Sequence, residues 1–349
     1  MGLAETVYHH LYMRRRRRFD PALSAQAATS ILPCKTISIG NLTTGGTGKT
    51  PAVQWVARRL QVQGIHVAVV ARGYGGRLSR EGAVVSDGAA VLHSAHDVGD
   101  EPVLHARALP GIPVIIGRDR VVAARLAAER FGVQVVVLDD AFQYWSLHRD
   151  LNVVLMDARR PFDNGHLLPR GRLREPPAAL ERADVVLLTR ADLASEEQRS
   201  AARAQIGRYT PAPIFEASHA PTALRDEVLG ERMPLHLEGM SVAAVSALAD
   251  NEAFQATVQA CGARIVAGLE RRDHHHWQPR ELQTFAREAE RAGAQALITT
   301  EKDAVKIQPN WLPPLPFWSL CIELRLGSDE AAFQALVSAV CAAAEKVRR

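Results

Sequence analysis

Short apolar runs alternate with segments of helical periodicity along most of the chain. Such runs, rich in β-branched residues, are typical of strands, and they occur at 36–39, 67–70, 113–116, 133–138, 152–156 and 185–188. Between them, 52–60 and 121–130 carry apolar residues at spacings of three and four, and Gly64 and Gly132 follow as stop signals. Because continuously apolar strands are buried on both faces, the pattern predicts an α/β fold with a parallel sheet flanked by helices.

The periodicity weakens at 212–240, where proline, histidine and charged residues accumulate. A smaller second series of strands and helices follows, with strand-like runs at 242–245, 264–267, 296–299 and 317–322. The pattern predicts two α/β domains, at 31–211 and 241–349, joined by a linker or hairpin at 212–240. We find no internal repeat, and we expect the smaller domain to form one wall of the substrate cleft.

Residues 1–30 form a separate N-terminal segment with a basic end. Apolar residues recur there at helical spacing before the arginine run 14–18; they are Leu3, Val7, Tyr8, Leu11 and Tyr12. A secretory signal has its basic residues first, so this order is wrong for one. Two interpretations stay open: an amphipathic element on an anionic membrane, where each basic side chain contributes about 1 kcal/mol, or a solvated basic tail.

Composition places the chain among ordinary globular proteins, with 47% hydrophobic and 23% charged residues. It has no apolar stretch near the roughly 20 residues of a membrane span. A net charge of +4 and a pI near 9.0 favour anionic partners, but nucleotides, nucleic acids and acidic lipids all qualify. The cysteines are scattered without a C-x-x-C pair, which argues against a disulfide scaffold and favours a reducing cytoplasm; they are Cys34, Cys261, Cys321 and Cys341.

The run 36–39 leads into a segment typical of a phosphate-binding loop, Thr43-Thr44-Gly45-Gly46-Thr47-Gly48-Lys49-Thr50. Glycines let backbone N–H groups surround phosphate oxygens, and the following helix directs its positive end at them. Lys49 would neutralise the outer phosphates, and the Thr50 hydroxyl would bind Mg²⁺. Thr43 stands where the general pattern has glycine, but the flanking strand and helix fit. We therefore predict a nucleoside triphosphate site.

Two acidic segments are candidates for metal binding and catalysis. Asp139 and Asp140 end the apolar run 133–138, and neighbouring side chains on a strand point to opposite faces, so one of them would face the metal. The segment 97–102 contains Asp97, Asp100 and Glu101 in an expected turn between strands. One carboxylate there could bind Mg²⁺ and another could accept a proton from an attacking hydroxyl. The alternatives are a turn cap for Asp139 and Asp140 and a solvated acidic turn for 97–102.

Histidines and arginines supply further candidates. His274, His275 and His276 follow Asp273, but neighbouring histidines diverge, which argues against zinc and leaves an exposed loop or one histidine that orients a carboxylate. Arginines that could bind phosphate occur in two loop-like stretches; they are Arg118, Arg120, Arg170, Arg172 and Arg174.

Seven motifs together resemble the tetraacyldisaccharide 4′-kinase family, the lipid A kinases, over about 36–310. They are GNLTTGGTGKTP at 40–51, DVGDEP at 97–102, GRDR at 117–120, LDDAFQ at 138–143, LREP at 173–176, DHH at 273–275 and TTEKDAV at 299–305. The family's loop has the form N-L-T-x-G-G, which accounts for Thr43. The resemblance implies transfer of the ATP γ-phosphate to the 4′-hydroxyl of a disaccharide 1-phosphate lipid, with Mg²⁺, giving lipid IVA at the cytoplasmic face of the Gram-negative inner membrane.

The resemblance also implies a catalytic pair. Asp100 would receive the proton of the sugar hydroxyl, and His274 would be its partner in a dyad that spans the two domains. We prefer His274 to His275 because it directly follows Asp273.

The remaining roles implied by the resemblance concern ATP and its metal. Thr50 and Glu101 would hold Mg²⁺, and Lys49 would hold the β- and γ-phosphates within the loop 43–50. Asp139 and Asp140 would order the metal shell and water. Arg120 and Arg174 would stabilise the transferred charge or the acceptor.

Family members usually carry a longer apolar helix before the basic stretch, so we expect a peripheral membrane contact that is weaker or rests on charge. We expect a monomer without a nucleic-acid partner. One alternative is a GTPase-like switch or metallochaperone, because Thr189-Arg190-Ala191-Asp192 faintly resembles the guanine-reading N-K-x-D. Another is a nucleotide-binding scaffold without turnover, although so many acids near a phosphate loop argue against it.

Overall fold

The computed structural model describes residues 2–19, 29–248, 250–312 and 315–348. Its first part is an eight-stranded sheet in the order β3-β4-β2-β5-β1-β6-β7-β8, in which only β3 runs antiparallel to its neighbour among the described strands. The strands are β1 (Lys35–Asn41), β2 (Val67–Ala71), β3 (Ala83–Ser86), β4 (Val114–Ile116), β5 (Val135–Asp139), β6 (Leu151–Asp157), β7 (Val185–Thr189) and β8 (Ile214–Glu216).

Both faces of this sheet are buried, as its continuously apolar strands predict. Along β2, Val67 and Val69 belong to one core cluster, whereas Ala68 and Val70 belong to another on the opposite face. The first cluster is covered by α2 (Lys49–Val62) and α4 (Asp100–Ala108), and the second by α5 (Arg120–Phe131). Helix α6 (Glu196–Ile206) packs beside β7 through Ala202 and Ile206.

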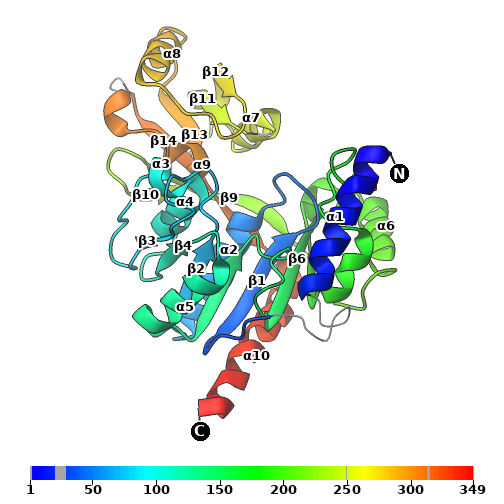
Figure 1. Cartoon of the computed structure of the whole chain (residues 1–349). Helices are drawn as coiled ribbons and strands as arrows, with labels where there is room; N and C mark the ends of the chain where they lie inside the picture. Colours follow the sequence, from blue (N-terminus) through cyan, green and yellow to red (C-terminus); the bar gives the residue numbers. More distant parts are fainter. Residues whose placement is uncertain (1, 20–28, 249, 313–314, 349) are drawn as a thin grey trace.

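The second part is a six-stranded sheet in the order β10-β9-β14-β13-β11-β12. Figure 1 shows it, with its helices, above the first sheet. The strands are β9 (Ser218–Asp226), β10 (Arg232–Pro234), β11 (Ser241–Ala247), β12 (Arg264–Arg271), β13 (Ala296–Thr300) and β14 (Phe317–Arg325), and the helices are α7 (Asn251–Ala260), α8 (Pro279–Arg291) and α9 (Glu301–Ala304). Strands β11 to β14 are mutually parallel.

The segment 212–240 is not a separate linker. It contributes β8 to the first sheet and then forms the hairpin of β9 and β10, which joins the second sheet through β14. Strands β9 and β14 are antiparallel and pair Ser218 with Arg325, so the chain enters and leaves the second sheet at adjacent positions.

The C-terminal helix α10 (Glu330–Arg348) corrects the predicted boundary of the second domain. It contacts α2 and β1 of the first part, and its Phe333 is fully buried there. The ring of Phe333 lies 5.2 Å from that of Trp55 and 5.8 Å from that of Phe215, measured between centroids. The second part therefore ends near the end of β14, not at the end of the chain.

Helix α1 (Leu3–Phe19) lies on the first part, and its apolar residues do not share one face. Tyr12 is buried and Tyr8 half-buried against the protein, whereas Leu3, Val7 and Leu11 are exposed. Among the residues that the structure describes, every helix is too short or too polar to cross a bilayer.

Candidate active site

The phosphate loop leaves the carboxyl end of β1, between β5 and β6. Its backbone is left-handed at Gly45 and Gly48, with φ of 110° and 79°, which glycine adopts without strain. The Asn41 amide holds the loop from inside, because its Nδ2 donates to the Thr43 carbonyl at 2.8 Å and to Thr47 Oγ1 at 2.9 Å. The backbone N–H groups at the start of α2 then follow directly after the loop, as anion binding requires.

The end of β7 supports the same loop from the other side. Thr189 Oγ1 donates to the Thr47 carbonyl at 3.1 Å, and Arg190 Nη2 donates to the Gly46 carbonyl at 2.7 Å. Arg190 is in turn held by Asp157 at 2.7 Å. Thr189 and Arg190, which occupy the first two positions of the segment compared with N-K-x-D, thus donate hydrogen bonds to the loop backbone.

Lys49 and the acids of β5 meet beside the loop. Lys49 Nζ lies 3.4 Å from Asn41 Oδ1 and 3.7 Å from Asp140 Oδ1. Asp140 has a left-handed backbone, with φ of 50°, and both of its carboxylate oxygens accept from Arg174 Nη1 at 2.9 Å. Gln143 Oε1 accepts from the same nitrogen at 3.2 Å. Asp140 is therefore shared between two cations.

Asp139 points into a different and fully buried environment. Its Oδ2 lies 3.2 Å from His105 Nε2, and its Oδ1 is buried without a hydrogen-bond partner among the described residues. Burial opposes its ionisation, but the His105 hydrogen bond and the charge of Lys49 outweigh that effect and lower the pKa of Asp139. Burial and the neighbouring Asp139 carboxylate raise the pKa of Glu101. Asp139 and Glu101 therefore place two acidic side chains close together, near Lys49.

Asp100 is the first residue of helix α4, not part of a turn between strands as the sequence suggested. The short helix α3 (Ala95–Val98) and α4 are separated by Gly99, with φ of 91°. A Cβ at Gly99 would lie 2.5 Å from the Tyr74 carbonyl oxygen, so only glycine fits there. Asp100 is 6% exposed and lies at the positive end of α4, which favours its ionised form.

The second part of the molecule supplies the partner of Asp100. His274 Nδ1 lies 3.0 Å from Asp100 Oδ2, and His274 has a left-handed backbone with φ of 61°. His275 instead points to Glu281, with its Nε2 3.0 Å from Oε2. The structure therefore brings His274, and not His275, to Asp100.

Lys302 of α9 completes this cluster, although it was not among the site residues predicted from the sequence. Its Nζ lies 3.0 Å from Asp273 Oδ1, 3.4 Å from His274 Nε2 and 3.9 Å from Asp100 Oδ2. Burial opposes the ionisation of Asp100, but the hydrogen bond from His274 and the charge of Lys302 outweigh it and lower the pKa of Asp100. The hydrogen bond to Asp100 raises the pKa of His274. Asp100 is thus ionised at neutral pH, as a proton acceptor must be.

The other predicted residues lie in varied positions. Arg120 is 4% exposed, and its Nη1 donates to the Gly117 carbonyl at 3.1 Å. Burial lowers the pKa of Arg120, although Asp139 opposes this. Thr50 lies in the first turn of α2. Arg118 and Arg170 are exposed, and Arg172 Nε lies 3.8 Å from Asp163.

Two histidines near the site were also missed by sequence reasoning. His105 supports Asp139 from the interior of α4, and nothing in its surroundings in the sequence distinguishes it from a core residue. His219 of β9 lies against the phosphate loop, since a Cβ at Gly48 would be 2.0 Å from its Nε2. Burial lowers the pKa of His219, so its imidazole is neutral there.

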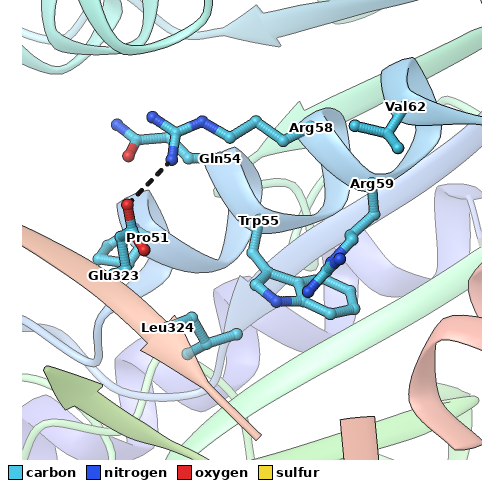
Figure 2. A pocket seen from close by; sticks show the side chains of 8 residues that line it. All are labelled: Pro51, Gln54, Trp55, Arg58, Arg59, Val62, Glu323 and Leu324. Atoms are coloured by element: carbon cyan, nitrogen blue, oxygen red, sulfur yellow. Dashed lines mark ion pairs between the residues drawn. The ribbon is translucent and has the colours of Figure 1, made fainter. Parts of the chain in front are cut away.

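A small cavity of about 250 Å³ lies elsewhere, between α2 and β14 (Figure 2). Among the residues that line it, Arg59 lies over the Trp55 ring and Arg58 pairs with Glu323. The acids described above do not line this cavity.

The family of the chain follows from comparison with known proteins. A sequence model of the family described as tetraacyldisaccharide-1-P 4′-kinase matches residues 3–342. The chain belongs to the tetraacyldisaccharide-1-P 4′-kinase family. Within it, the tetraacyldisaccharide 4′-kinase of Syntrophus aciditrophicus (strain SB) is 44% identical over 315 residues, covering 88% of this chain and 84% of that protein. That of Anaeromyxobacter dehalogenans (strain 2CP-C) is 45% identical over 310 residues, covering 88% and 80%.

The fold of this family member also matches a solved structure. The crystal structure of LpxK from Aquifex aeolicus in complex with ATP has a TM-score of 0.78 and 28% identity, and the match covers 96% of each chain. The predicted α/β fold with a large parallel sheet is thereby confirmed, as is the resemblance drawn from the seven motifs. This member of the tetraacyldisaccharide-1-P 4′-kinase family is an ATP-dependent kinase.

Proposed function

We propose that this kinase transfers the γ-phosphate of ATP to the 4′-hydroxyl of tetraacyldisaccharide 1-phosphate, forming lipid IVA in lipid A biosynthesis. The observation that carries the proposal is the contact between Asp100 of the first part of the molecule and His274 of the second. Lys49 and Asp140 meet at the phosphate loop of the first part. When a hydroxyl group receives the phosphate, a base next to the phosphate must take up its proton. The pair of Asp100 and His274 can provide this base, and the pair forms only when the first and second parts of the molecule, here called the two lobes, are in contact.

In this assignment, Asp100 accepts the proton of the 4′-hydroxyl as its oxygen attacks the γ-phosphate in line. His274 donates from Nδ1 to Asp100 Oδ2 and orients the carboxylate. Lys49 and the loop 43–50 hold the β- and γ-phosphates, and Arg120 and Arg174 stabilise the charge of the transferred group or the acceptor. Asp140 is held by Arg174 and Lys49, which fixes its carboxylate toward the phosphate side of β5.

The residues beside the loop fit Mg²⁺, with Thr50 and Glu101 as its protein ligands. The buried Asp139 Oδ1 without a partner and the nearby Glu101 carboxylate form a site that a divalent cation would neutralise. Within the described residues, no group of three His, Cys, Asp or Glu side chains could hold a metal by itself. Such a sparse set suits Mg²⁺, which binds through one or two carboxylates plus phosphates and water. When bound, it would neutralise charge on the β- and γ-phosphates.

We further propose that α1 makes peripheral contact with an anionic membrane, at the cytoplasmic face of the inner membrane of a Gram-negative bacterium, and that the protein is a monomer. Support comes from the exposed apolar side chains Leu3, Val7 and Leu11, which repeat every four residues along α1. Exposed arginines follow on the same helix; they are Arg14, Arg15, Arg17 and Arg18. Apolar side chains with adjacent basic ones bind acidic lipid interfaces.

The test of the proton acceptor is Asp100→Asn, which keeps the shape of the side chain and removes its charge. We expect kcat to fall by about 10²–10⁴, the usual contribution of a general base, while ATP affinity stays close to that of the wild type. Phosphorylation of the lipid by labelled ATP and ATP binding by calorimetry would be measured together. Asp97→Asn is the matched control, because Asp97 lies three residues away and pairs with Arg77 on the surface. An unchanged kcat in Asp100→Asn would remove Asp100 from this role.

The substrate proposal has its own test with the wild-type protein. We expect label from ATP to appear on disaccharide 1-phosphate lipid, and ATP consumption to depend on that lipid. A GTPase-like switch would prefer GTP and ignore the lipid. The structure favours the kinase here, because Thr189 and Arg190 are engaged by the phosphate loop and not presented to a base.

A further inference from the structure

Helix α1 makes polar contacts with the rest of the protein that binding to a membrane would not require. Glu5 is only 3% exposed although it is ionisable and lies near the end of the chain. Its Oε1 accepts from the Leu167 backbone N–H at 3.0 Å and lies 3.3 Å from His166 Nδ1. One turn further along, Tyr8 Oη donates to the Arg174 carbonyl at 2.9 Å. Glu5 and Tyr8 therefore hold the two ends of one segment, residues 167–174.

The segment 167–174 is the outer support of the phosphate loop. Its Arg172 carbonyl accepts from the Thr44 N–H at 2.8 Å, and the Arg174 N–H donates to the Leu42 carbonyl at 2.7 Å. Thr43 and Leu173 form an antiparallel bridge between these contacts. The entry to the phosphate loop is thus paired, backbone to backbone, with the segment that α1 holds.

The same segment also fixes one of the acids of the site. The Arg174 side chain binds both oxygens of Asp140, while the Arg174 carbonyl receives the Tyr8 hydroxyl. Arg174 therefore links α1 to Asp140. Lys49 Nζ lies 3.7 Å from Asp140 Oδ1.

A second set of contacts fixes α1 in place along its axis. Tyr12 packs edge-on against Trp145 with ring centroids 5.6 Å apart, and the Arg15 guanidinium lies 5.5 Å from the centre of the same ring. Arg16 pairs with Glu181. These contacts hold α1 against Trp145, five residues after Asp140 in the chain, and against Glu181.

We propose that α1 positions the phosphate loop and Asp140 through Glu5, Tyr8 and the segment 167–174, in addition to any membrane contact. Glu5 and Tyr8 are then positioning residues for ATP, although neither reaches the nucleotide. The roles of the loop and of Asp140 rest on the proposed function, whereas the contacts of α1 do not.

The test uses Tyr8→Phe and Glu5→Gln in the full-length protein, with ATP binding followed by calorimetry. Each change removes or weakens one hydrogen bond, so we expect ATP affinity to fall by about 2- to 12-fold in each variant. With lipid dispersed in detergent, kcat/KM for ATP should fall by a similar factor. Tyr209→Phe and Glu129→Gln are matched controls, because both residues are exposed on the first part of the molecule, and they should keep wild-type affinity.

Two further measurements make the outcome decisive. Sedimentation with vesicles containing anionic lipid should show unchanged binding for Tyr8→Phe, because its hydroxyl faces the protein. Wild-type ATP affinity in folded Tyr8→Phe would overturn the proposal, as would a loss confined to vesicle binding. If Glu5→Gln fails to fold, Tyr8→Phe alone decides. Calorimetry needs no lipid, so a wild-type protein that fails to phosphorylate lipid would refute the proposed function and leave this test intact.

Discussion

Lys302 is the only cation within 4 Å of Asp100 besides the imidazole of His274, among the residues that the structure describes. It comes from the motif at 299–305, and it also binds Asp273, next to His274 in the chain. Lys302 is half-buried between Asp100 and Asp273, and its pKa is raised because these two carboxylates outweigh the effect of burial. Lys302 therefore connects the motifs at 273–275 and 299–305 of the second lobe to Asp100 of the first.

We predict that Lys302→Met moves the acid side of the pH–rate profile upward. The charge of Lys302 lowers the pKa of Asp100, so its removal lets that pKa rise toward its usual value. A base works only when deprotonated, and activity would then be lost at a higher pH as the solution is acidified. The measurement is kcat/KM for the lipid against pH. Lys302→Arg keeps the charge and should keep the wild-type profile; an acid limb that stays in place in Lys302→Met would refute the prediction.

Sequence reasoning found the acids and His274 through motifs, and it missed residues that act through the fold. His105 and Lys302 reach Asp139 and Asp100 only because α4 and α9 place them there. His105 has no neighbouring pattern that marks it before the fold is known, and the motif at 299–305 contains Lys302 but gave it no role. The choice between His274 and His275 rested on position alone, whereas the structure shows which ring reaches Asp100.

At the scale of elements, helix α2 has a positive-φ glycine at each end, and the two differ in what surrounds them. Gly48 has φ of 79° and faces His219, whereas Gly64 has φ of 78° and open space around it. Strand and helix patterns predicted α2 and its loop from the sequence. They did not predict that β9 of the other sheet closes against the loop, because this contact joins residues far apart in the chain.

We predict that Gly48→Ala abolishes most ATP binding while Gly64→Ala does not. A left-handed backbone costs a residue with a Cβ about 1–2 kcal/mol, so both variants should lose some stability. Only at Gly48 would the new Cβ also lie 2.0 Å from His219 Nε2, which displaces the imidazole or the loop. Thermal unfolding and ATP calorimetry on both variants would separate strain from crowding. Equal ATP affinity in the two variants would contradict this account.

Elements with a long apolar run were predicted well, and short or polar ones were not. Strand β3 has four residues and the hairpin strand β10 has three, and both pair antiparallel at the edges of their sheets. Asp100 was expected in a turn, because Gly99 and Pro102 suggest one. Proline is tolerated in the first turn of a helix, and Gly99 supplies the sharp change of direction before it, so the same residues also begin α4.

At the scale of the whole molecule, the C-terminal helix α10 returns to the first sheet after the second one is complete. Its apolar face resembles that of any amphipathic helix, so the sequence could not show which sheet it covers. The exposed and protein-facing residues of α1 were likewise not separable by spacing alone. Contacts of Glu5 with Leu167 and of Tyr12 with Trp145 fix the rotation of the helix.

We predict that Phe333→Ala destabilises the nucleotide-binding lobe. Phe333 is fully buried between Trp55 and Phe215, and removal of a buried phenylalanine typically costs about 3–5 kcal/mol. Urea denaturation followed by Trp fluorescence would report it, since Trp55 is in contact with the ring. Leu336→Ala, at a site that is 36% exposed, should cost much less. Similar losses in the two variants would show that α10 is not part of this core.

The adjacent pairing of Ser218 with Arg325 makes the second lobe an insertion within the first. Partners across an antiparallel pair have Cα atoms about 4.5–5.5 Å apart, a gap that a tight turn closes. A shortened gene that joins residue 217 to residue 326 through two or three glycines would therefore encode a complete nucleotide-binding sheet with its closing helix. Such a miniature protein would retain every residue of the phosphate loop and lose His274 and Lys302 together, which separates nucleotide capture from phosphate transfer in one deletion.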